Sequence, residues 1–345
     1  NLEDQDNKSI KEDLLRKNLE KRGYQDSEIS AAISKLQRVA GNQVNSLYDA
    51  NKEFYLLLRY GTDVRSDNNH RLSVHFIDWD NPKANDFYVA EEVSVLREDG
   101  RTRKRPDLVI YVNGIALGMF ELKRSSVSLG EGIRQLLQNQ RKENIQTFFN
   151  TVQILFAGNE SEGLKYGVIE TPQKYYLQWK EDVKATNSLS TTVKEFIGDS
   201  ANKLRNAIVS LCQKERFLSL IHDFLIFDAG VKKIARHNQY FAVIASRNRI
   251  LEGEGGIVWN TQGSGKSLIM AWLAKWVIES PDVPDGRVVI ITDREELDSQ
   301  IESLFFNVGE NVTRARSGSD LREILNTNTS PIVCSLIHKY GHNAG

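Results

Sequence analysis

Cysteine and long hydrophobic runs are scarce in this chain of 345 residues. Its two cysteines, Cys212 and Cys334, lie far apart and without metal-ligand spacing, which argues against a disulfide framework and indicates a reducing, cytoplasmic compartment. No apolar run approaches the ~20 residues of a membrane span, and the polar residues 1–8 are unlike a signal peptide. The six histidines include no pair with ligand spacing, so zinc is not expected.

An excess of one charge is also missing. The formal net charge is −1, so any contact with nucleic acid must come from local patches. The chain is longer than one compact core usually holds, and we expect two domains. A first domain is predicted over residues 1–180, a linker and helical connection over 181–212, and a second domain over 213–345. Because the sequence begins without Met and residues 341–345 carry no terminal element, we expect a fragment of a longer protein.

The stretch that organises the chain is Asn260–Ser267, Asn-Thr-Gln-Gly-Ser-Gly-Lys-Ser. It follows the apolar run Ile257–Trp259, which we expect to be a strand, and precedes an apolar helical pattern. A glycine-rich loop at a helix N-terminus presents backbone N–H groups to a phosphate chain. Lys266 would reach the β- and γ-phosphates, and the hydroxyl of Ser267 would ligate Mg²⁺. The predicted nucleotide-binding residues of this loop are Thr261, Gly263, Ser264, Gly265, Lys266 and Ser267.

A second chemical centre lies upstream, where two β-rich runs flank a strong hairpin signal, Asn113–Gly114. The first run carries Asp107 after a proline, and the second carries Glu121-x-Lys123. Two carboxylates can hold Mg²⁺ through oxygen ligands, and a neighbouring lysine can orient water or stabilise developing negative charge. This is the Pro-Asp…(Asp/Glu)-x-Lys pattern of many nucleases, although the bare pattern also fits an exposed hairpin edge decorated with charge.

The register of this hairpin tests the nuclease interpretation. A two-residue turn pairs Val112 with Ile115 and places Asp107 and Glu121 on opposite faces of the ribbon, because side chains alternate along a strand. A three-residue loop would place the two carboxylates on one face. A bulge near Gly118 would realign them in the same way. The nuclease interpretation therefore requires one of these two irregularities.

Alternating strands and helices extend on both sides of these motifs. A capping signature at residue 128 predicts a helix from Glu131 to about residue 144, with Gln135 one turn after Glu131 on its more polar face. Downstream, residues 287–292 are expected to be a buried parallel strand, and residues 331–336 another strand. The order of elements predicts an α/β nuclease-like core followed by a doubly wound RecA-like sheet.

With these motifs in place, the chain resembles the R subunit of type I restriction enzymes, the motor and nuclease subunit often called HsdR. The nuclease hairpin lies upstream of the motor motifs, in the order that this family uses. Four further stretches carry the resemblance: Arg236–Ala242 is similar to the adenine-recognising segment, Thr261–Ser267 to helicase motif I, Thr292–Gln300 to the next motif, and Ile337–Tyr340 to the DNA-contacting motif after that.

The resemblance implies a restriction-endonuclease-like (PD-(D/E)xK) domain followed by a truncated RecA-like superfamily 2 helicase domain. It implies an ATP-dependent DNA translocase and Mg²⁺-dependent endonuclease that acts on double-stranded DNA with modification (methyltransferase) and specificity subunits. Gln239 would recognise adenine. The family's Gln-x-x-x-Tyr element is Gln135-x-x-x-Asn139 here, so only Gln135 is carried over. The implied catalytic residues are Asp107, Glu121, Lys123 and Gln135, and the implied Mg²⁺ ligands are Asp107, Glu121 and Ser267.

Two features of this family are not found in the sequence, an Asp-Glu-x-His strand and a second RecA-like lobe with an arginine finger. The run 288–293 imitates a Walker B strand, with Asp293 as the metal-binding acid, but its Asp-Arg-x-x-Leu context fits the earlier motif better. Another helicase–nuclease fusion in DNA repair is an alternative. So is a non-catalytic, ATP-responsive DNA-binding scaffold with a degenerate hairpin.

Overall fold

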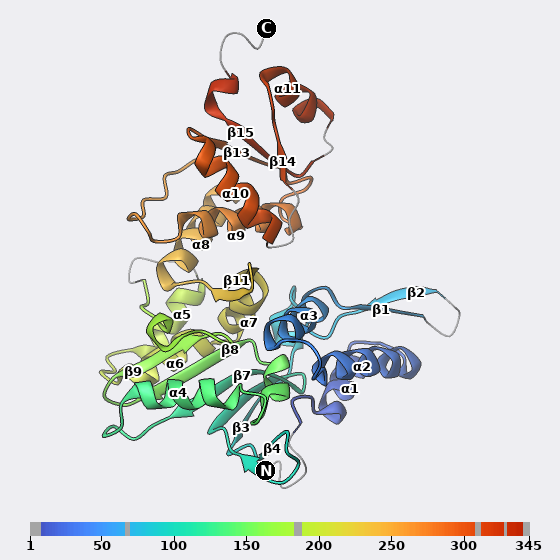
Figure 1. Cartoon of the computed structure of the whole chain (residues 1–345), viewed down its shortest axis with the longest axis vertical. Helices are drawn as coiled ribbons and strands as arrows, with labels where there is room; N and C mark the ends of the chain where they lie inside the picture. The colour runs from blue at the N-terminus through green and yellow to red at the C-terminus, as the bar shows by residue number, and fades with distance from the viewer. Residues whose placement is uncertain (1–7, 66–69, 183–187, 308–311, 328–329, 341–345) are drawn as a thin grey trace. The chain divides into compact units, whose positions relative to one another are not determined.

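A computed structural model describes residues 8–65, 70–182, 188–307, 312–327 and 330–340. The chain divides into two compact units (Figure 1). The first comprises residues 1–225 and 230–234, and the second comprises residues 226–229 and 235–345. This division differs from the predicted domain bounds, because residues 188–225 group with the first unit. Part of the predicted linker, residues 183–187, lies outside the described residues.

A mixed six-stranded sheet is the centre of the first unit, with strand order β10-β9-β8-β7-β6-β3. The hairpin β6–β7 and strands β8 and β9 supply its middle, and β7 and β8 run parallel. The strands are β3 (Phe87–Glu91), β6 (Leu108–Val112), β7 (Ile115–Leu122), β8 (Ile154–Asn159), β9 (Gly163–Gly167) and β10 (Leu177–Gln178). β7 is buried along almost its whole length, as expected for a strand with neighbours on both sides and helices on both faces.

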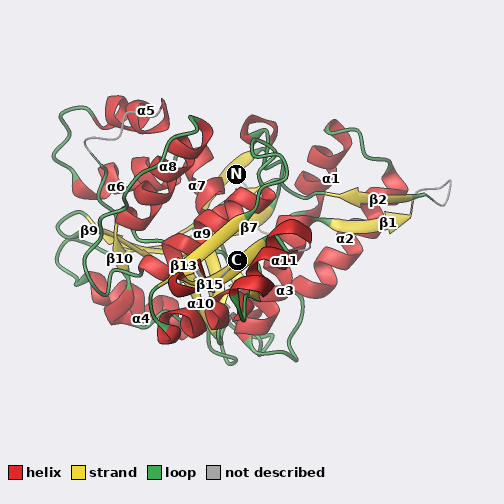
Figure 2. Cartoon of the chain, turned by 90° about the horizontal axis from the view of Figure 1, so that it is seen from above, coloured by secondary structure: helices red, strands yellow, loops and turns green. Residues whose placement is uncertain are grey.

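Helices cover both faces of this sheet (Figure 2). On one face α4 (Leu129–Asn139) and η2 (Gln146–Asn150) bury Ile133, Leu136 and Phe149 against strand residues such as Met119. On the other face α6 (Lys203–Cys212) packs on β9, and the ring of Phe217 from α7 (Lys214–Asp223) approaches Gly118. α5 (Ser188–Ile197) packs on α6. The predicted helix 131–144 is thus shorter and begins two residues earlier.

Three helices precede the sheet: α1 (Glu12–Lys21), α2 (Asp26–Ala40) and α3 (Leu47–Tyr60). A two-stranded arm, β1 (Thr62–Arg65) with β2 (Arg71–Val74), follows α3 and packs on α2. The arm projects beyond the helices in both views (Figures 1 and 2). The remaining short elements of this unit are η1 (Pro82–Ala84), β4 (Val95–Leu96), β5 (Arg103–Lys104) and η3 (Gln173–Tyr175).

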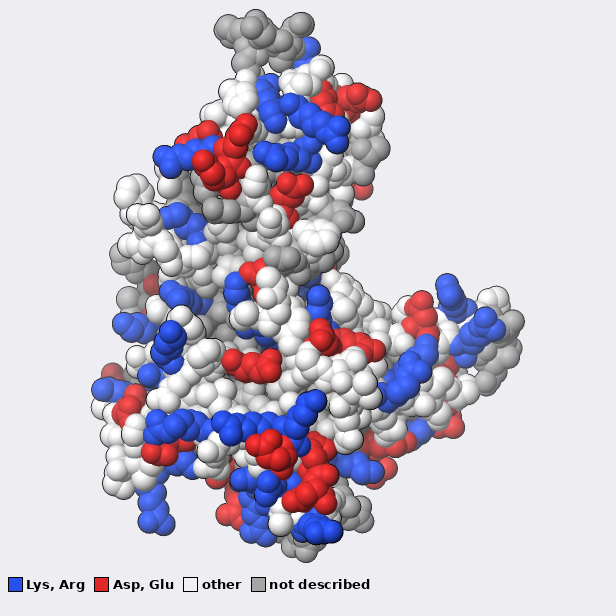
Figure 3. Space-filling view, viewed as in Figure 1, with Lys and Arg blue, Asp and Glu red and all other residues white. Residues whose placement is uncertain are grey.

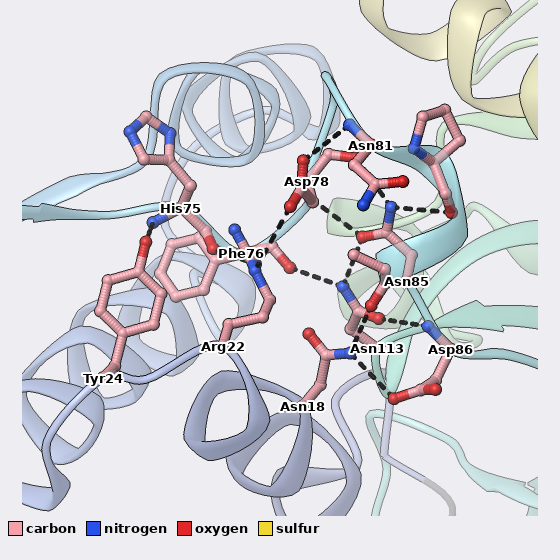
Figure 4. A network of polar contacts seen from close by, with 12 residues as sticks. Asn18, Arg22, Tyr24, His75, Phe76, Asp78, Asn81, Asn85, Asp86 and Asn113 are labelled. Atoms are coloured by element: carbon pink, nitrogen blue, oxygen red, sulfur yellow. Dashed lines mark hydrogen bonds and ion pairs between the residues drawn. The ribbon is translucent and has the colours of Figure 1, made fainter.

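A network of buried amides joins these helices to the sheet (Figure 4). Asn113 is at the turn of the β6–β7 hairpin, where its φ of 50° and that of Gly114, 83°, fit the predicted two-residue turn. Its side-chain amide donates to the Phe76 carbonyl at 2.9 Å and to Asn85 Oδ1 at 2.8 Å, and its Oδ1 accepts from the Asp86 N–H at 2.7 Å. The network therefore fixes the turn against the chain that leaves β2.

The second unit contains a three-stranded parallel sheet of order β13-β15-β14. The strands are β13 (Val288–Thr292), β14 (Val312–Arg314) and β15 (Ile332–Leu336), so the two predicted strands are present. The predicted burial of the first was wrong, because Val289 and Ile291 of β13 are exposed among the described residues. The helices are α8 (His237–Leu251), α9 (Lys266–Glu279), α10 (Glu295–Asn307), α11 (Gly318–Thr327) and η4 (Ile337–Tyr340). Where the chain passes between the units lie β11 (Leu225–Asp228) and β12 (Val231–Ile234).

The predicted strand before the phosphate-binding loop was wrong. Ile257 and Trp259 are 89% and 91% exposed, and residues 254–260 form neither helix nor strand. Among the described residues of this unit, no neighbour covers these side chains or pairs with their backbone. An apolar run specifies a strand only where a sheet accepts it, and β13 pairs with β15 alone.

Candidate functional sites

The first site lies at the open end of the β6–β7 hairpin, away from the turn, where β6 begins and β7 ends. The hairpin has the two-residue turn, in which Val112 pairs with Ile115. It also has a β-bulge, where the register shifts between Tyr111 and Ile110 of β6. Tyr111 pairs with Ala116, whereas Ile110 pairs with Gly118, so β7 carries one extra residue. This is the bulge near Gly118 that the nuclease interpretation required.

The bulge reverses which residues of β7 face α4. Before it, Ala116 belongs to the core cluster on the α4 side, and after it Met119 does. The odd-numbered residues that follow, Glu121 and Lys123, therefore also face α4. The ladder ends with the pair Leu108 and Phe120, and the charge of Asp107, the residue before Leu108, acts on the carboxyl group of Glu121. The structure thus brings the two carboxylates to one face of the sheet, although they flank a two-residue turn.

Short polar contacts organise the four predicted residues. Asp107 Oδ2 accepts from the backbone N–H of Leu122 at 2.5 Å. Lys123 Nζ donates to Glu121 Oε1 at 2.6 Å and to Gln135 Oε1 at 2.7 Å. Gln135 comes from the second turn of α4, which ties that helix to the end of β7. Asn139, one turn further on, is buried, and its Oδ1 is without a hydrogen-bond partner among the described residues.

Burial gives Glu121 unusual electrostatics. Its residue exposure is 1%, and desolvation, together with the nearby charge of Asp107, raises its pKa to about 7. The ammonium group of Lys123 acts in the opposite direction on this pKa. α4 packs directly on this residue, since a Cβ at Gly132 would lie in ordinary contact with it, 3.4 Å from the Glu121 carbonyl oxygen and 3.6 Å from its Cγ.

The donor set fits a magnesium ion. Glu121 Oε2 is buried and has no hydrogen-bond partner among the described residues, next to a second carboxylate. A cation there would satisfy this oxygen and relieve the repulsion between the two acids. In the described part of the chain, no group of three or more His, Cys, Asp or Glu side chains could hold a metal. Two carboxylates suffice for Mg²⁺, which usually keeps several of its waters.

The second site is the loop before α9. Gly263 and Gly265 have φ values of 74° and 81°, in the left-handed region that glycine adopts readily, and Gly265 caps the helix. No atom of the described residues would lie within 4 Å of a Cβ at Gly263, so a ligand can approach the backbone there. Lys266 Nζ donates to the carbonyls of Asn260 and Thr261, at 3.1 and 3.2 Å. The loop therefore folds around its own lysine.

Gln239 reaches this loop from α8. It is buried, its Nε2 donates to the Ser264 carbonyl at 2.9 Å, and its Oε1 accepts from the Arg236 N–H at 2.9 Å. Ser267 is the second residue of α9 and is half-buried. The hydroxyl of Ser264 is buried without a hydrogen-bond partner among the described residues. The loop thus presents the N-terminus of a long helix and an unsatisfied hydroxyl, which fit a phosphate.

Sequence reasoning did not anticipate a third polar cluster, around Lys232. This lysine is buried in the first unit, and its Nζ donates to Asn51 Oδ1 at 2.7 Å and to Gln153 Oε1 at 2.6 Å. Desolvation lowers its pKa well below the usual value. The sequence offered no signal for it, since Lys232 and Lys233 are adjacent and only the fold distinguishes them.

Comparison with known families decides the identity of the first unit. The family described as type I restriction enzyme R protein N terminus matches residues 1–174. The chain belongs to this family. Residues 238–345 match a second family, described as SWI2/SNF2 ATPase. The family assignment thus agrees with the resemblance seen in the motifs.

Individual relatives are named as endonuclease subunits of type I restriction enzymes. The chain is 30% identical to the MjaIXP endonuclease subunit of Methanocaldococcus jannaschii, over 85% of this chain and 30% of that protein. It is 25% identical to the type I restriction enzyme HindI endonuclease subunit of Haemophilus influenzae, over 91% and 31% respectively. A third is the SauCOLORF180P endonuclease subunit of Staphylococcus aureus, 26% identical over 82% and 29%. The chain therefore spans about 30% of the length of these relatives.

Proposed function

We propose that this chain is the N-terminal part of the restriction subunit of a type I restriction-modification system. Its first unit would be a Mg²⁺-dependent endonuclease for double-stranded DNA, with a PD-(D/E)xK fold. Its second unit would be the first, RecA-like part of an ATP-driven DNA translocase. The observation that carries the proposal is the bulge in β7, because it brings Asp107, Glu121 and Lys123 to one face.

The proposed roles follow from the geometry of the first site. Asp107 and Glu121 would hold Mg²⁺, which when bound supplies charge neutralisation at the scissile phosphate and a more acidic water. Lys123 would orient that water or stabilise negative charge as it develops. Gln135 would hold the ammonium group in place through its 2.7 Å contact. The hydrogen bond from the Leu122 N–H fixes the Asp107 carboxylate, so it need not reorganise when the metal binds.

In the second unit, the loop Thr261–Ser267 would bind the phosphates of ATP, with Ser267 directed to its Mg²⁺ and Gln239 near the adenine. The match to an ATPase family over residues 238–345 supports this proposal. Sequence recognition would come from partner subunits for modification and specificity. No described helix is long and apolar enough to cross a membrane.

The alternative of a non-catalytic scaffold needs a degenerate hairpin with its carboxylates on opposite faces. The register supports the nuclease instead. The experiment that tests the choice uses the intact protein with its partner subunits. Asp107→Asn, Glu121→Gln and Lys123→Ala should each abolish DNA cutting and leave ATP hydrolysis intact, whereas Lys266→Ala should abolish hydrolysis.

Glu131→Gln is a suitable control, because Glu131 is an exposed acid of α4 whose carboxylate pairs with Arg134 of the same helix. It should cut normally. Cutting that survives in both Asp107→Asn and Glu121→Gln would refute the nuclease assignment.

A further inference from the structure

The arm β1–β2 carries a pair of arginines that the candidate sites do not use. Arg65 and Arg71 pair directly across the two strands. Both are exposed, and neither has a hydrogen bond or ion pair with the described residues. Like charges directly opposite each other destabilise a two-stranded ribbon. The repulsion between the two arginines would be relieved by a negatively charged binding partner.

The two faces of the arm differ clearly. One face carries Thr62, Val64 and Val74, which are 8%, 4% and 0% exposed and lie toward α2, on which the arm packs. The other face carries Arg65 and Arg71, with Asp63 and Ser73 two pairs nearer the root. Asp63 Oδ1 accepts from the Ser73 hydroxyl at 2.6 Å, and among the described residues it forms no ion pair with either arginine. The outward face therefore presents two guanidinium groups.

The arm is fixed in direction at its root. Gly61 has a φ of 75°, and a Cβ there would lie 2.5 Å from the Val74 carbonyl oxygen, so the strands are closely apposed where they leave α3. After β2, the backbone carbonyl of His75 accepts from the Arg22 guanidinium at 2.7 Å. The backbone N–H of His75 donates to the Tyr24 hydroxyl at 3.2 Å. Figure 4 shows these contacts beside the amide of Asn113.

This root also ties the arm to the candidate nuclease site. Phe76, two residues after β2, accepts from the Asn113 amide. Asn113 forms the turn of the same β6–β7 hairpin that carries Asp107 and Glu121 at its other end. The arginine pair is thus held at a set position relative to the two carboxylates, through one hairpin and one buried amide.

We propose that the outward face of the arm contacts the phosphate backbone of the duplex that the nuclease cuts, with Arg65 and Arg71 as the contacting residues. This inference rests on the proposed function. Arginine binds phosphate oxygens through charge-assisted, often bidentate hydrogen bonds. A two-stranded ribbon, with strands ~4.8 Å apart, is also narrow enough for the major groove, which is about 12 Å wide.

The charge of the chain favours a local contact of this kind. Its formal net charge is −1, so general attraction cannot hold a polyanion. Figure 3 shows acidic and basic side chains intermingled over most of this face, including the region of the arm and α2. The contact would be independent of base sequence, because phosphates position a protein on DNA and carry no sequence information directly.

The experiment compares the intact protein with its Arg65→Gln/Arg71→Gln double variant. Binding to a fluorescent duplex of arbitrary sequence is titrated between 50 and 200 mM salt. Loss of two phosphate contacts should weaken binding about tenfold at the lowest salt and reduce the slope of log K against log salt by about 2. Arg38→Gln, which removes an exposed arginine of α2, is the matched control and should leave the affinity and the slope unchanged.

Each other outcome has a defined meaning. If the unmodified protein binds and cuts the duplex and the double variant binds it with the same affinity and slope, the arm proposal is overturned while the nuclease proposal stands. If the double variant keeps its DNA affinity but fails to assemble with the modification and specificity subunits, the arm docks protein, and the proposal is again overturned. If the unmodified protein neither binds nor cuts duplex DNA, the proposed function itself fails.

Discussion

Lys123 Nζ and Gln135 Oε1 lie 2.7 Å apart, which joins the end of β7 to α4 across the candidate nuclease site. The same ammonium group donates to Glu121 at 2.6 Å. The amide therefore holds the lysine from one side and the carboxylate holds it from the other. On the proposed function, Gln135 would influence catalysis without touching a metal, because it holds the ammonium group of Lys123.

Gln135→Ala should slow cutting by roughly 10- to 100-fold, the usual effect of losing a partner that orients a catalytic group. ATP hydrolysis and Mg²⁺ affinity should stay near their original values, since no metal-binding oxygen is removed. Single-turnover cleavage with varied Mg²⁺ separates these effects. Gln138→Ala is the control, because Gln138 lies on the same helix and is exposed. Equal loss in both variants would indicate damage to α4 rather than loss of positioning.

Stability of the metal-free protein should depend on pH through Glu121. Burial raises its pKa from the ordinary 4.5 to about 7, so between these values the folded state holds a proton that the unfolded state has lost. The free energy of unfolding therefore falls as pH rises through that window. Above pH 7 the folded protein bears the full cost of burying an ionised carboxylate. Glu121→Gln should be the more stable protein at pH 8, by roughly 3 kcal/mol, with little difference near pH 4.

Urea unfolding in the presence of a chelator, at several pH values, measures this difference. Glu131→Gln, at an exposed acid, should show no such dependence. A constant offset between Glu121→Gln and the unmodified protein from pH 5 to 8 would mean that the carboxyl group is not desolvated as the structure indicates.

The packing of α4 on β7 should tolerate one added carbon at Gly132 but no more. A Cβ there would make ordinary contacts, the nearest at 3.4 Å to the Glu121 carbonyl oxygen. Gly132→Ala should therefore fold and cut, with a gain of up to about 1 kcal/mol from helix propensity. Gly132→Val adds two methyl groups facing Glu121 and should reduce cutting strongly. Thermal unfolding together with cleavage assays checks both variants, and a fully active Gly132→Val would show that this contact is loose.

Lys232→Met should destabilise the first unit by about 1–3 kcal/mol, because Asn51 Oδ1 and Gln153 Oε1 would each lose a buried donor. The neighbouring Lys233→Met provides the comparison, since Lys233 is only half-buried and should matter less. Denaturant unfolding gives both free energies. If the two substitutions cost the same, the buried contacts of Lys232 contribute little.

The sequence predicted the local features of the candidate sites better than their surroundings. The Asn113–Gly114 turn and the helix that begins at Lys266 depend on glycine and asparagine conformations, which are set within a few residues. The bulge could be inferred only as one of two alternatives. The nuclease interpretation needed Asp107 and Glu121 on one face, but no residue of β7 specifies how the strands achieve it. The cluster around Lys232 joins residues from three distant segments, so nothing local distinguishes this lysine.

The failed prediction has the same cause. Ile257–Trp259 has the composition of a strand, but strand formation depends on a pairing partner, and the described sheet of the second unit offers it none. The unit boundary after residue 225, rather than at 213, also follows from tertiary packing, since the ring of Phe217 in α7 packs against Gly118 of the sheet in the first unit. Apolar periodicity identifies a helix but does not say which core receives it.

The last prediction concerns Gln239 and nucleotide choice. A single amide can satisfy both the donor N6 and the acceptor N7 of adenine, so Gln239→Ala should weaken ATP binding and remove discrimination against GTP. The structure adds a second role, since the same amide bonds the Ser264 carbonyl and the Arg236 N–H. Gln239→Glu keeps the acceptor for Arg236 and loses the donor. Affinities for ATP and GTP, measured for both variants, distinguish the roles. A fall of equal size for the two nucleotides would make Gln239 a support for the loop and not a reader of the base.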